Sequence, residues 1–558
     1  MLQKHIILIM ITMLVSTAFI SAGSCMKLEK SEINNKKDEA ETEALAELPS
    51  YFSWRDIDGV DFSTPIKNQS PYGSCETFAL TAALEIMVQY KVGYPFGCDL
   101  SEAHLYFHSG GNLDFGSFPE NDTNYLVEHG IPDEACWPYP SDLKAYPLNT
   151  SCPDWQNRTV KIKDWRYLPE DINAIKHALI NNGPVPTYFM SYKDFVYHKK
   201  GIYEHKWGKI HGPHYVTIVG YNDDPGYWII KNSWGTGVQE NGWFRIKYGE
   251  CSIEKKSIYL SEVYGRFPIN YVDDDNIMGP WNGSKEYPFQ TIQDAIDQSP
   301  EGYTIYVMNG TYQENIVINK TIKLDGKNNQ TTIIDGGGNG HVVVISAPDV
   351  RISGFTIQNS GNIPYDSGIK TLSLNSNATI KNNIIQNNDI GLFLNYAYWE
   401  SKNFVENNII KYNRDGISIH HAYNNKISGN TIIKNREDGI ETELVKTSSI
   451  TNNNISDNGE CGLFLRSNTN DNTISEGNIF RNNSIGIKLT NCYINVISGN
   501  NFIENKIQAY FEYSYLNKWR RNYWDDWQKI LPKIIKGKLH TTNLTWINID
   551  WLPSKKLN

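Results

Sequence analysis

Glycine followed by an aliphatic residue recurs at a nearly fixed interval in the C-terminal half of the chain. Successive steps are separated by 23, 25, 23, 23 and 24 residues. The six steps are Gly368-Ile369, Gly391-Leu392, Gly416-Ile417, Gly439-Ile440, Gly462-Leu463 and Gly486-Ile487. A fixed period of this length is typical of one small unit stacked many times, because one unit alone cannot bury its apolar face. The period therefore predicts a solenoid.

Each repeat consists of short alternating apolar runs separated by asparagine-rich corners. Gly391 to Leu394 is one such run, and Asn382-Asn383 and Asn387-Asn388 flank another. Asparagine tolerates left-handed backbone, and its amide can form a ladder with the coil below. Leucine-rich repeats have similar periods, but these units have no L-x-x-L-x-L framework and no helical stretch. The pattern favours a parallel β-helix, with room for roughly nine coils between Thr304 and Tyr510.

The repeats resemble the right-handed β-helices of pectate lyases and, more closely, repeat domains of archaeal surface proteins. Those domains often begin with a segment like residues 279–284 and continue with one like Thr291 to Ile296, which would form an amphipathic capping helix. The resemblance implies an all-β right-handed parallel β-helix over residues 269–510, with a C-terminal cap over residues 511–558.

Catalysis of the pectate-lyase kind would need clustered acidic metal ligands and a basic residue on one face, and the repeats do not supply that set. We expect Arg351, His420, His421 and Asp438 to be solvated corner residues. The β-helix is expected to act as a spacer or to bind a surface polysaccharide. The alternative is that the β-helix is itself a polysaccharide lyase or hydrolase.

Length and charge exclude several classes of protein. At about 150 residues per domain, 558 residues are too many for one core. The net charge of −10 and a pI near 5.8 give a phosphate backbone no general attraction, so nucleic acid is not an expected partner. With 40% hydrophobic and 20% charged residues, most of the chain can bury a core.

The N-terminus has the order of a secretory signal. Lys4 and His5 precede an apolar run from Ile6 to Ala22, and small residues lead to Cys25. We expect residues 1–25 to be a signal peptide or a lipoprotein signal, with Cys25 as a candidate for lipidation. An uncleaved membrane anchor is the alternative. Either interpretation places the protein outside the cell or on its surface, with the membrane reached only through this end.

A charged segment follows, and then a domain rich in Tyr, Trp and Pro. Residues 26–47 are expected to form a solvated tether, and residues 48–268 a folded domain. Within that domain, Cys75 opens a run of apolar residues at helical spacing that closes near Gly93. A thiol at a helix N-terminus lies at the positive end of the backbone dipole, which favours the thiolate and supplies an N–H donor for an oxyanion.

A nucleophilic cysteine needs a base and a group that orients the base. His214 begins the strand-like motif H-x-V-x-x-V-G-Y, Asn232 lies in K-N-S-W-G, and Gln69 precedes Cys75 by six residues. These motifs, in this order, resemble the papain family of cysteine peptidases. The likeness covers about 215 residues, because Leu48 to Arg55 looks like the mature start of that family, and Gly183-Pro184-Val185 and residues 240–246 match its later segments.

The resemblance implies an α+β papain-like fold and a role for each motif residue. Cys75 attacks the peptide carbonyl to form a thioester, His214 pairs with the thiolate and protonates the leaving amine, and Asn232 orients the imidazole. The Gln69 side chain and the Cys75 backbone N–H would bind the oxyanion. Trp234 would shield the His214–Asn232 contact from water. His211 lacks the motif register and is expected at the surface or the cleft edge.

Two residues depart from the family pattern. Glu76 stands where the family usually has Trp, and at ~6 Å its charge would oppose the thiolate by up to ~3 kcal/mol at an effective dielectric of 20. Tyr72 replaces the usual structural Cys, so one disulfide is missing. We expect a less acidic Cys75 and a slower enzyme. The same observation motivates the runner-up hypothesis, a non-catalytic surface adhesin with a degenerate papain-like domain.

The chain has eight cysteines, which suits an oxidising exterior. Cys136 and Cys152 flank a loop and are the favoured disulfide pair, whereas Cys98 and Cys251 either pair with each other or stay thiols. No spacing matches a zinc site, so neither metal nor cofactor is expected. The segment between Cys25 and Leu48 is too short for the family's inhibitory pro-domain, so no folded zymogen domain is expected. The sequence thus predicts an exported cysteine endopeptidase that acts on peptides or proteins.

Overall fold

The computed structural model describes residues 48–111, 116–140, 152–372, 376–395, 402–528, 531–539 and 544–557. The expected signal, the Cys25 lipidation candidate and the tether all lie outside these residues. Among the described residues, no helix is both long and apolar enough to cross a membrane. The chain divides into two compact units, and the division splits the domain predicted for residues 48–268. The first unit takes the N-terminal part to Gln69 with residues 78–87 and 164–261, and the second takes residues 70–77, 88–163 and 262–558.

The first unit is built on a six-stranded sheet in the order β1-β6-β7-β8-β5, with β4 paired to β6. Its central strand β6 is buried from His214 to Tyr221, because both faces are covered. Its elements are β1 (Tyr51–Ser53), β3 (Trp165–Tyr167), α5 (Ile172–Asn181), β4 (Val185–Tyr192), α6 (Lys193–Tyr197), β5 (Ile202–Tyr203), β6 (Ile210–Asn222), β7 (Tyr227–Lys231), β8 (Trp243–Lys247), η2 (Glu250–Ser252) and β9 (Ile258–Leu260). The core of this unit gathers large apolar side chains from β4, β6, β7 and β8.

The helix predicted to start at Cys75 is α2 (Cys75–Val92). It ends at Gly93, whose φ of 78° lies in the left-handed region and whose N–H closes the last turn on Gln89 and Tyr90. The second unit also contains α3 (Glu102–His108), α4 (Pro119–Glu128), η1 (Trp155–Arg158), and β2 (Val160–Ile162) paired with β10 (Val263–Gly265). Cys136 and Cys152, the pair favoured from the sequence, form a disulfide, and Cys98 and Cys251 are thiols.

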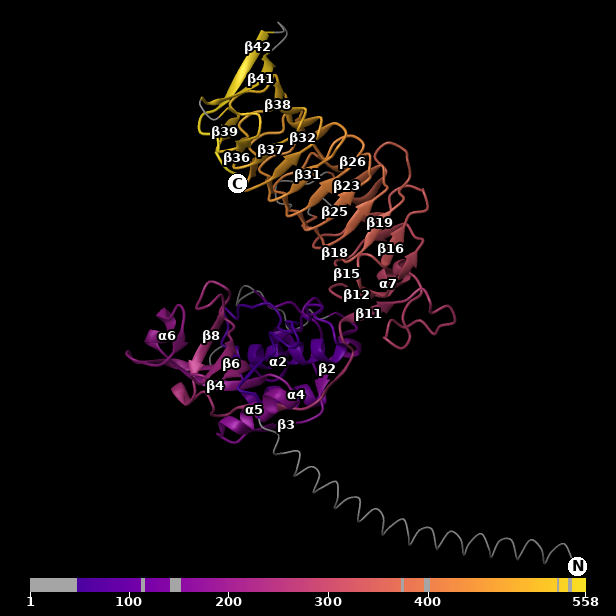
Figure 1. Ribbon diagram of the computed structural model, residues 1–558. Helices are drawn as coiled ribbons and strands as arrows, with labels where there is room; N and C mark the ends of the chain where they lie inside the picture. The colour runs from indigo at the N-terminus through magenta and orange to yellow at the C-terminus, as the bar shows by residue number, and fades with distance from the viewer. Residues whose placement is uncertain are drawn as a thin grey trace, which may run out of the picture. The chain divides into compact units, whose positions relative to one another are not determined.

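The repeats form a right-handed parallel β-helix whose coils stack one on another (Figure 1). The six Gly-aliphatic steps lie in register, so that Ile369, Leu392, Ile417, Ile440, Leu463 and Ile487 form one column. All six side chains are buried in one continuous core. Each buried aliphatic side chain contributes about 1.5–3 kcal/mol, which explains why the period is kept.

The coils contribute strands to three parallel faces. One face is a ten-stranded sheet of β13 (Gly310–Tyr312), β16 (Thr332–Asp335), β19 (Thr356–Gln358), β22 (Ile384–Gln386), β25 (Ile409–Lys411), β28 (Thr431–Ile433), β31 (Asn454–Ser456), β34 (Ile479–Arg481), β37 (Asn501–Ile503) and β40 (Tyr523–Trp524). A second face runs through β12 (Thr304–Val307), β15 (Lys323–Gly326), β18 (Arg351–Ser353), β21 (Thr379–Lys381), β24 (Phe404–Glu406), β27 (Lys426–Ser428), β30 (Ser449–Thr451), β33 (Thr473–Ser475), β36 (Val496–Ser498) and β39 (Lys518–Arg520). The third runs through β14 (Ile316–Ile318), β17 (Val343–Ile345), β20 (Ser367–Thr371), β23 (Ile390–Asn395), β26 (Asp415–His420), β29 (Ile440–Glu443), β32 (Cys461–Arg466), β35 (Ile485–Thr490) and β38 (Ile507–Glu512).

Both ends of the β-helix are capped. At the start, β11 (Ile269–Val272) pairs with β12, and α7 (Ile292–Gln298) forms the expected capping helix, with Thr291 Oγ1 accepting from Asp294 N. At the far end, β41 (Lys533–Leu539) and β42 (Leu544–Asp550) form an antiparallel pair. The rings of Phe502 and Trp524 stack at 4.1 Å beneath this cap.

The asparagine pairs divide two tasks between them. The first residue of a pair takes the left-handed corner, as Asn382 (φ 57°) and Asn407 (φ 56°) do. The second points into the coil, where Asn383 Nδ2 donates to Asn408 Oδ1 at 3.2 Å and Asn408 Nδ2 donates to Asn430 Oδ1 at 3.0 Å. This ladder continues through Asn453, Asn478, Asn500 and Asn522.

Within the second unit, the segment that follows α2 packs on the first coils of the β-helix. The ring of Tyr94 lies 4.6 Å from that of Tyr306, and its hydroxyl donates to Asp325 Oδ2 at 3.3 Å. Lys323 Nζ donates to the carbonyl oxygen of Gly97 at 2.6 Å. The β-helix is therefore joined to the Cys75-bearing part of the chain by specific contacts.

Candidate active site

Cys75 lies at the first position of α2 and is buried. Ser74 precedes it, and Ser74 Oγ and Tyr139 Oη are within hydrogen-bond distance at 2.7 Å. Thr77 Oγ1 donates to the carbonyl oxygen of Ser74 at 2.9 Å, and this bond fixes the backbone at the N-terminus of α2. The backbone N–H groups in the first turn of an α-helix have no carbonyl partner within the helix, which makes such a turn a suitable donor for an oxyanion.

Glu76 contacts the thiol directly. Cys75 Sγ donates to Glu76 Oε2 at 3.3 Å. Burial raises the pKa of Glu76, and hydrogen bonds from its own backbone N–H and from Cys75 oppose that rise. A thiol that donates to a carboxylate is stabilised in its protonated form. Glu76, which was expected to oppose the thiolate by its charge, therefore also stabilises the protonated thiol by accepting its hydrogen bond.

Gly116 packs closely against the backbone of Gly73, just before α2. A Cβ at Gly116 would lie 2.8 Å from the carbonyl oxygen of Gly73 and 4.0 Å from Glu76 Oε2. The φ of Gly116 is +81°, a conformation that disfavours other residues. Glycine at this position thus allows the backbone beside Gly73 to approach the start of α2.

His214 and Asn232 form a buried pair in the first unit. His214 lies on β6, Asn232 follows the end of β7, and His214 Nε2 is 2.8 Å from Asn232 Oδ1. An amide oxygen only accepts, so Nε2 carries a proton and Nδ1 is the nitrogen that takes up or releases one. Asn232 Oδ1 also accepts from Ser233 N at 2.8 Å, and Asn232 Nδ2 donates to Gln239 Oε1 at 3.3 Å, which fixes the amide.

The environment keeps the His214 imidazole neutral at neutral pH. Burial lowers the pKa of His214 to about 4, the contact with Asn232 acts to raise it, and the nearby His211 lowers it further. The ring of Trp234 stacks on that of His214 at 4.7 Å and 28°. His211 itself is exposed, as expected for a histidine at the cleft edge. A neutral imidazole covered by an indole suits a base that accepts a proton from a thiol.

Gln69 is tied to the residue that follows Asn232. Its backbone N donates to the carbonyl oxygen of Ser233 at 2.8 Å, and Ser233 Oγ donates to Gln69 Oε1 at 2.7 Å. The second bond identifies Nε2 as the donor end of the amide, which is the end that an oxyanion requires. The first unit thus brings together Gln69, His214, Asn232 and Trp234, while Cys75 and Glu76 lie together at the start of α2.

The chain matches two family models. The model described as papain family cysteine protease matches residues 48–261. A cathepsin B-like protein, CP3, of Giardia intestinalis is 33% identical over 215 residues, which are 35% of this chain and 68% of that protein. The chain belongs to the papain family of cysteine proteases. A cathepsin L-like protein of Caenorhabditis elegans is 32% identical over 232 residues, covering 38% of this chain and 64% of that protein.

Solved structures of cysteine proteases also match. The Carica candamarcensis protease CMS1MS2, in complex with E-64, is 27% identical with a TM-score of 0.33, covering 38% of this chain and 99% of that chain.

The second family model, described as periplasmic copper-binding protein (NosD), matches residues 296–544. Among the described residues, no group of three or more His, Cys, Asp or Glu is placed to hold a metal ion. The likeness of the repeats to archaeal surface proteins stays a prediction.

A buried ionic network that was not predicted from the sequence lies beside the His–Asn pair of this papain-family chain. Lys231, which directly precedes Asn232, donates through Nζ to Thr64 Oγ1 at 2.5 Å. Thr64 Oγ1 donates in turn to Glu85 Oε2 at 2.6 Å, and Lys67 Nζ lies 2.7 Å from Glu85 Oε1. The sequence feature that could have indicated it is Glu85, a carboxylate between the apolar residues Leu84 and Ile86 in the middle of α2. This network joins the Gln69 segment, α2 and the end of β7.

The expectation of solvated corner residues in the β-helix is right for one residue and wrong for others. His421 is exposed at a corner with φ 51°. His420 and Asp438 are only 9% and 5% exposed. His420 is the last residue of β26, and Asp438 lies just before β29, where it bonds Asp415 and Cys461 of the neighbouring coils. His420 Nε2 is 3.1 Å from Ser418 Oγ. Arg351 pairs with Asp325 rather than with solvent.

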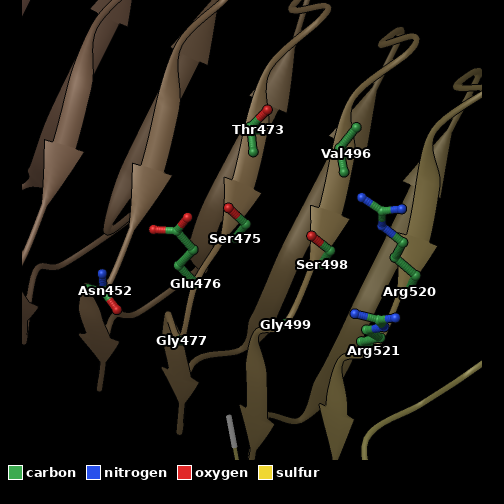
Figure 2. Close-up of a pocket in the computed structure, with 10 residues that line it drawn as sticks. All are labelled: Asn452, Thr473, Ser475, Glu476, Gly477, Val496, Ser498, Gly499, Arg520 and Arg521. Carbon is green, nitrogen blue, oxygen red and sulfur yellow. The ribbon is translucent and has the colours of Figure 1, made fainter.

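A surface pocket of about 970 Å³ lies on the outer side of β33, β36 and β39. Figure 2 shows Arg520 and Arg521 at one end and Glu476, with Asn452 beside it, towards the other. The hydroxyls of Thr473, Ser475 and Ser498 lie between these charged ends (Figure 2). Thus both signs of charge and several hydroxyls share one depression, which suits a polar ligand.

Gly499 keeps this pocket open. Ser475, Ser498 and Arg520 are in register, so the residues that follow them, Glu476, Gly499 and Arg521, occupy one corner column. All three have positive φ, at 58°, 67° and 56°. The backbone therefore does not require glycine at 499, and a Cβ there would meet nothing nearer than Glu476 N at 3.8 Å. A side chain at position 499 would therefore extend into the space that Gly499 lines.

Proposed function

We propose that Cys75, His214, Asn232 and Gln69 form the catalytic site of an exported endopeptidase. The buried His214–Asn232 pair carries the proposal, because it presents an oriented neutral imidazole on the strand and in the motif that the papain family uses. The position of Cys75 at the first turn of α2 supports it. The substrates of such a site are peptides or proteins.

The reaction then follows from these groups. Cys75 Sγ attacks the peptide carbonyl carbon while its proton passes to His214 Nδ1, and the resulting oxyanion accepts from Cys75 N–H and Gln69 Nε2. The C–N bond breaks as His214 donates that proton to the leaving amine, which leaves a thioester on Cys75. Water then attacks the thioester with His214 as base, releasing the carboxylic acid and restoring the thiol.

The test is cleavage of a fluorogenic peptide library by the full chain in mild reductant, with a thiol-directed covalent probe beside it. Cleavage that disappears in Cys75→Ala and persists in Cys461→Ala, a buried β-helix thiol, supports the proposal. Asn232→Ala should lower kcat/KM by about 100-fold, since the imidazole loses its orienting partner. Absence of cleavage together with absence of probe labelling would refute the catalytic role.

The adhesin hypothesis has one observation in its favour, the Cys75–Glu76 hydrogen bond. If Glu76 kept the thiol protonated throughout the working pH range, the cleft would bind peptides without cutting them. Probe labelling without cleavage, together with peptide binding to the wild-type chain, would support this second function.

Export and surface location are a further part of the proposal, and the order of charged, apolar and small residues before Cys25 supports them. The measurement is cell fractionation with N-terminal sequencing of the mature protein. A first residue at Cys25 that carries a lipid indicates a lipoprotein, an intact N-terminus in the membrane indicates an anchor, and a cytoplasmic full-length chain contradicts export.

The β-helix is proposed to hold the peptidase at the cell surface by binding a polysaccharide. The Arg520–Glu476 pocket supports this role, because sugar hydroxyls and sugar carboxylates need acceptors and cations side by side. Gly499→Asn should fill the pocket without new strain, since the same corner already carries Glu476 and Arg521. Polysaccharide binding in a pull-down that falls at least tenfold in Gly499→Asn supports the pocket, and unchanged binding contradicts it. Release of sugar by Cys75→Ala would instead identify the β-helix as an enzyme.

A further inference from the structure

One segment of the first unit concentrates positive charge in an acidic chain. Residues 193–211 contain five lysines and three histidines against two acids, whereas the whole chain has a net charge of −10. The segment runs through α6 and β5 to the start of β6. It therefore forms a basic surface beside the strand that carries His214.

A pocket of about 440 Å³ opens in this segment, here called the Trp207 pocket. Its lining includes Tyr197, Lys199, Lys200, Lys206 and Trp207. Tyr197 and Trp207 are 62% and 54% exposed, and their rings stack at 6.2 Å and 21°. A stacked pair of large aromatic side chains left open to water is typical of a binding surface.

The loop that presents Trp207 is held from below by a buried carboxylate. Asp194 accepts from the backbone N of Lys206 at 2.7 Å, from the backbone N of Trp207 at 3.0 Å and from Tyr203 Oη at 2.7 Å. Burial acts to raise the pKa of Asp194, but these hydrogen bonds and that from His205 hold it well below its usual range. The aromatic pair is thus presented on a fixed loop, which lowers the entropic cost of binding a ligand.

The lysines leave the pocket with a positive charge. Lys206 Nζ lies 3.7 Å from Glu204, which Lys247 also contacts at 3.2 Å, so two cations share one carboxylate. Lys199 and Lys200 have no acidic partner within the described part of the chain. An acidic ligand therefore meets at least two uncompensated charges here.

The segment that lines the Trp207 pocket leads directly into β6, the strand that carries His214. Lys193 N donates to the carbonyl oxygen of Lys209, and β4 and β6 stay paired from there to His214. Ile210 lies four residues before His214 on β6, about 13 Å away at 3.3 Å per residue. The rings of Phe195 and Trp234 lie 5.6 Å apart, which links α6 to the indole that covers His214.

We propose that the Trp207 pocket binds an acidic, aromatic-containing stretch of the protein substrate on the C-terminal side of the cleaved bond. This inference rests on the proposed function, since His214 protonates the amine of that side. An extended chain spans 13 Å in about four residues, so the bound stretch begins about four residues beyond the cleaved bond. Acidic residues there would meet Lys199 and Lys200, and an aromatic residue would pack on Trp207.

The experiment compares quenched fluorescent peptides that share all residues before the cleaved bond. Beyond it they carry, from the fourth residue, Asp-Phe-Glu, Ser-Gly-Ser or Lys-Phe-Lys. In the full chain we expect kcat/KM for the acidic peptide to exceed that for the neutral one at least tenfold, with the basic peptide poorest. The ratio of kcat/KM for the acidic peptide to that for the neutral peptide should fall towards one in Lys199→Gln/Lys200→Gln and in Trp207→Ala. In wild type, the same ratio should fall when the salt concentration is raised from 50 to 500 mM, because salt screens the lysine charges.

Lys255→Gln/Lys256→Gln is the matched control, because these two neighbouring exposed lysines lie in the same unit outside the pocket. An acidic-to-neutral ratio near one in wild type, or equal ratios in the pocket and control variants, overturns the inference while peptide cleavage still supports the peptidase. If no peptide is cleaved, anisotropy of the labelled acidic peptide on Cys75→Ala decides. Binding at least tenfold weaker when Lys199 and Lys200 are also changed supports the pocket, and equal binding overturns it.

Discussion

Cys75 Sγ donates a hydrogen bond to Glu76 Oε2 at 3.3 Å, so the proposed nucleophile is bonded directly to an acidic residue. A carboxylate this close stabilises the thiol over the thiolate, and the helix dipole acts in the opposite direction. The balance between them sets the fraction of reactive thiolate.

Glu76→Gln should therefore make Cys75 more reactive at neutral pH. The pKa of Glu76 is raised by burial, so the carboxylate is charged only above this raised value and becomes neutral as the pH falls through it. We expect iodoacetamide to label the variant about 3–30-fold faster than wild type at pH 7–8, with the difference shrinking at acidic pH. The control is Glu120→Gln, an exposed acid in the first turn of α4. Equal labelling of Glu76→Gln and wild type across the pH range would contradict this role.

Much of the fold follows from the sequence because its signals are local. The period of the Gly-aliphatic steps specifies a column of buried side chains, and Leu392 and Ile417 are indeed in register. The asparagine pairs indicated corners and ladders. The geometry of the coil decides which asparagine of a pair forms the corner and which forms the ladder. Only the second one, such as Asn408, points into the coil and bonds the asparagine of the next coil.

The site was predictable only where the family motif fixes it. His214 and Asn232 stand in recognisable strand and turn motifs, and the structure pairs them. The contacts that support the site are made between residues far apart in the chain, such as Lys231 and Thr64. A local sequence pattern does not indicate which distant residues lie next to each other. The burial of His420 was missed for a related reason, because neighbouring coils cover it.

Glu85→Ala should destabilise the first unit and impair catalysis together. Glu85 is fully buried, accepts from Thr64 and pairs with Lys67, and through Thr64 it reaches Lys231. Removing one partner leaves buried polar groups without compensation, which costs about 3–5 kcal/mol. We expect a lower Tm by differential scanning fluorimetry and a loss of kcat/KM at temperatures below unfolding. A variant with an unchanged Tm would show that the network contributes little to stability, and Glu128→Ala on the exposed end of α4 controls for charge.

Asp122→Asn should flatten the dependence of stability on pH. Burial raises the pKa of Asp122 to about 7, against the hydrogen bonds from Ser109 and Ser117 that lower it. Since the pKa is higher in the folded chain than the ordinary 3.8, the folded state binds this proton more tightly. The stabilisation is fully present below pH 3.8 and is lost as the pH rises to about 7.

The amide that replaces this carboxyl group has no such proton to lose. We expect wild type to lose roughly 2–4 kcal/mol more stability than Asp122→Asn between pH 4 and pH 7.5, measured by urea unfolding at a series of pH values. Asp164→Asn, at an exposed position, should follow wild type. Parallel curves for Asp122→Asn and wild type would mean that Asp122 is already charged in the folded chain at acidic pH.

Tyr94 gives a test of whether the β-helix stabilises the part of the chain that carries Cys75. Its ring packs on Tyr306 and its hydroxyl donates to Asp325, both on the first coils, within the same compact unit. Tyr94→Ala removes both contacts and should cost about 2–4 kcal/mol, whereas Tyr94→Phe removes only the hydrogen bond and should cost about 1 kcal/mol. Tyr90→Ala is the matched control, because Tyr90 lies on α2 with half of its side chain exposed. The measurement is hydrogen exchange of the backbone amides at the start of α2. If the β-helix stabilises the segment that bears Cys75, these amides should exchange faster in Tyr94→Ala than in Tyr90→Ala. Equal exchange in the two variants would mean that the β-helix and this segment fold independently.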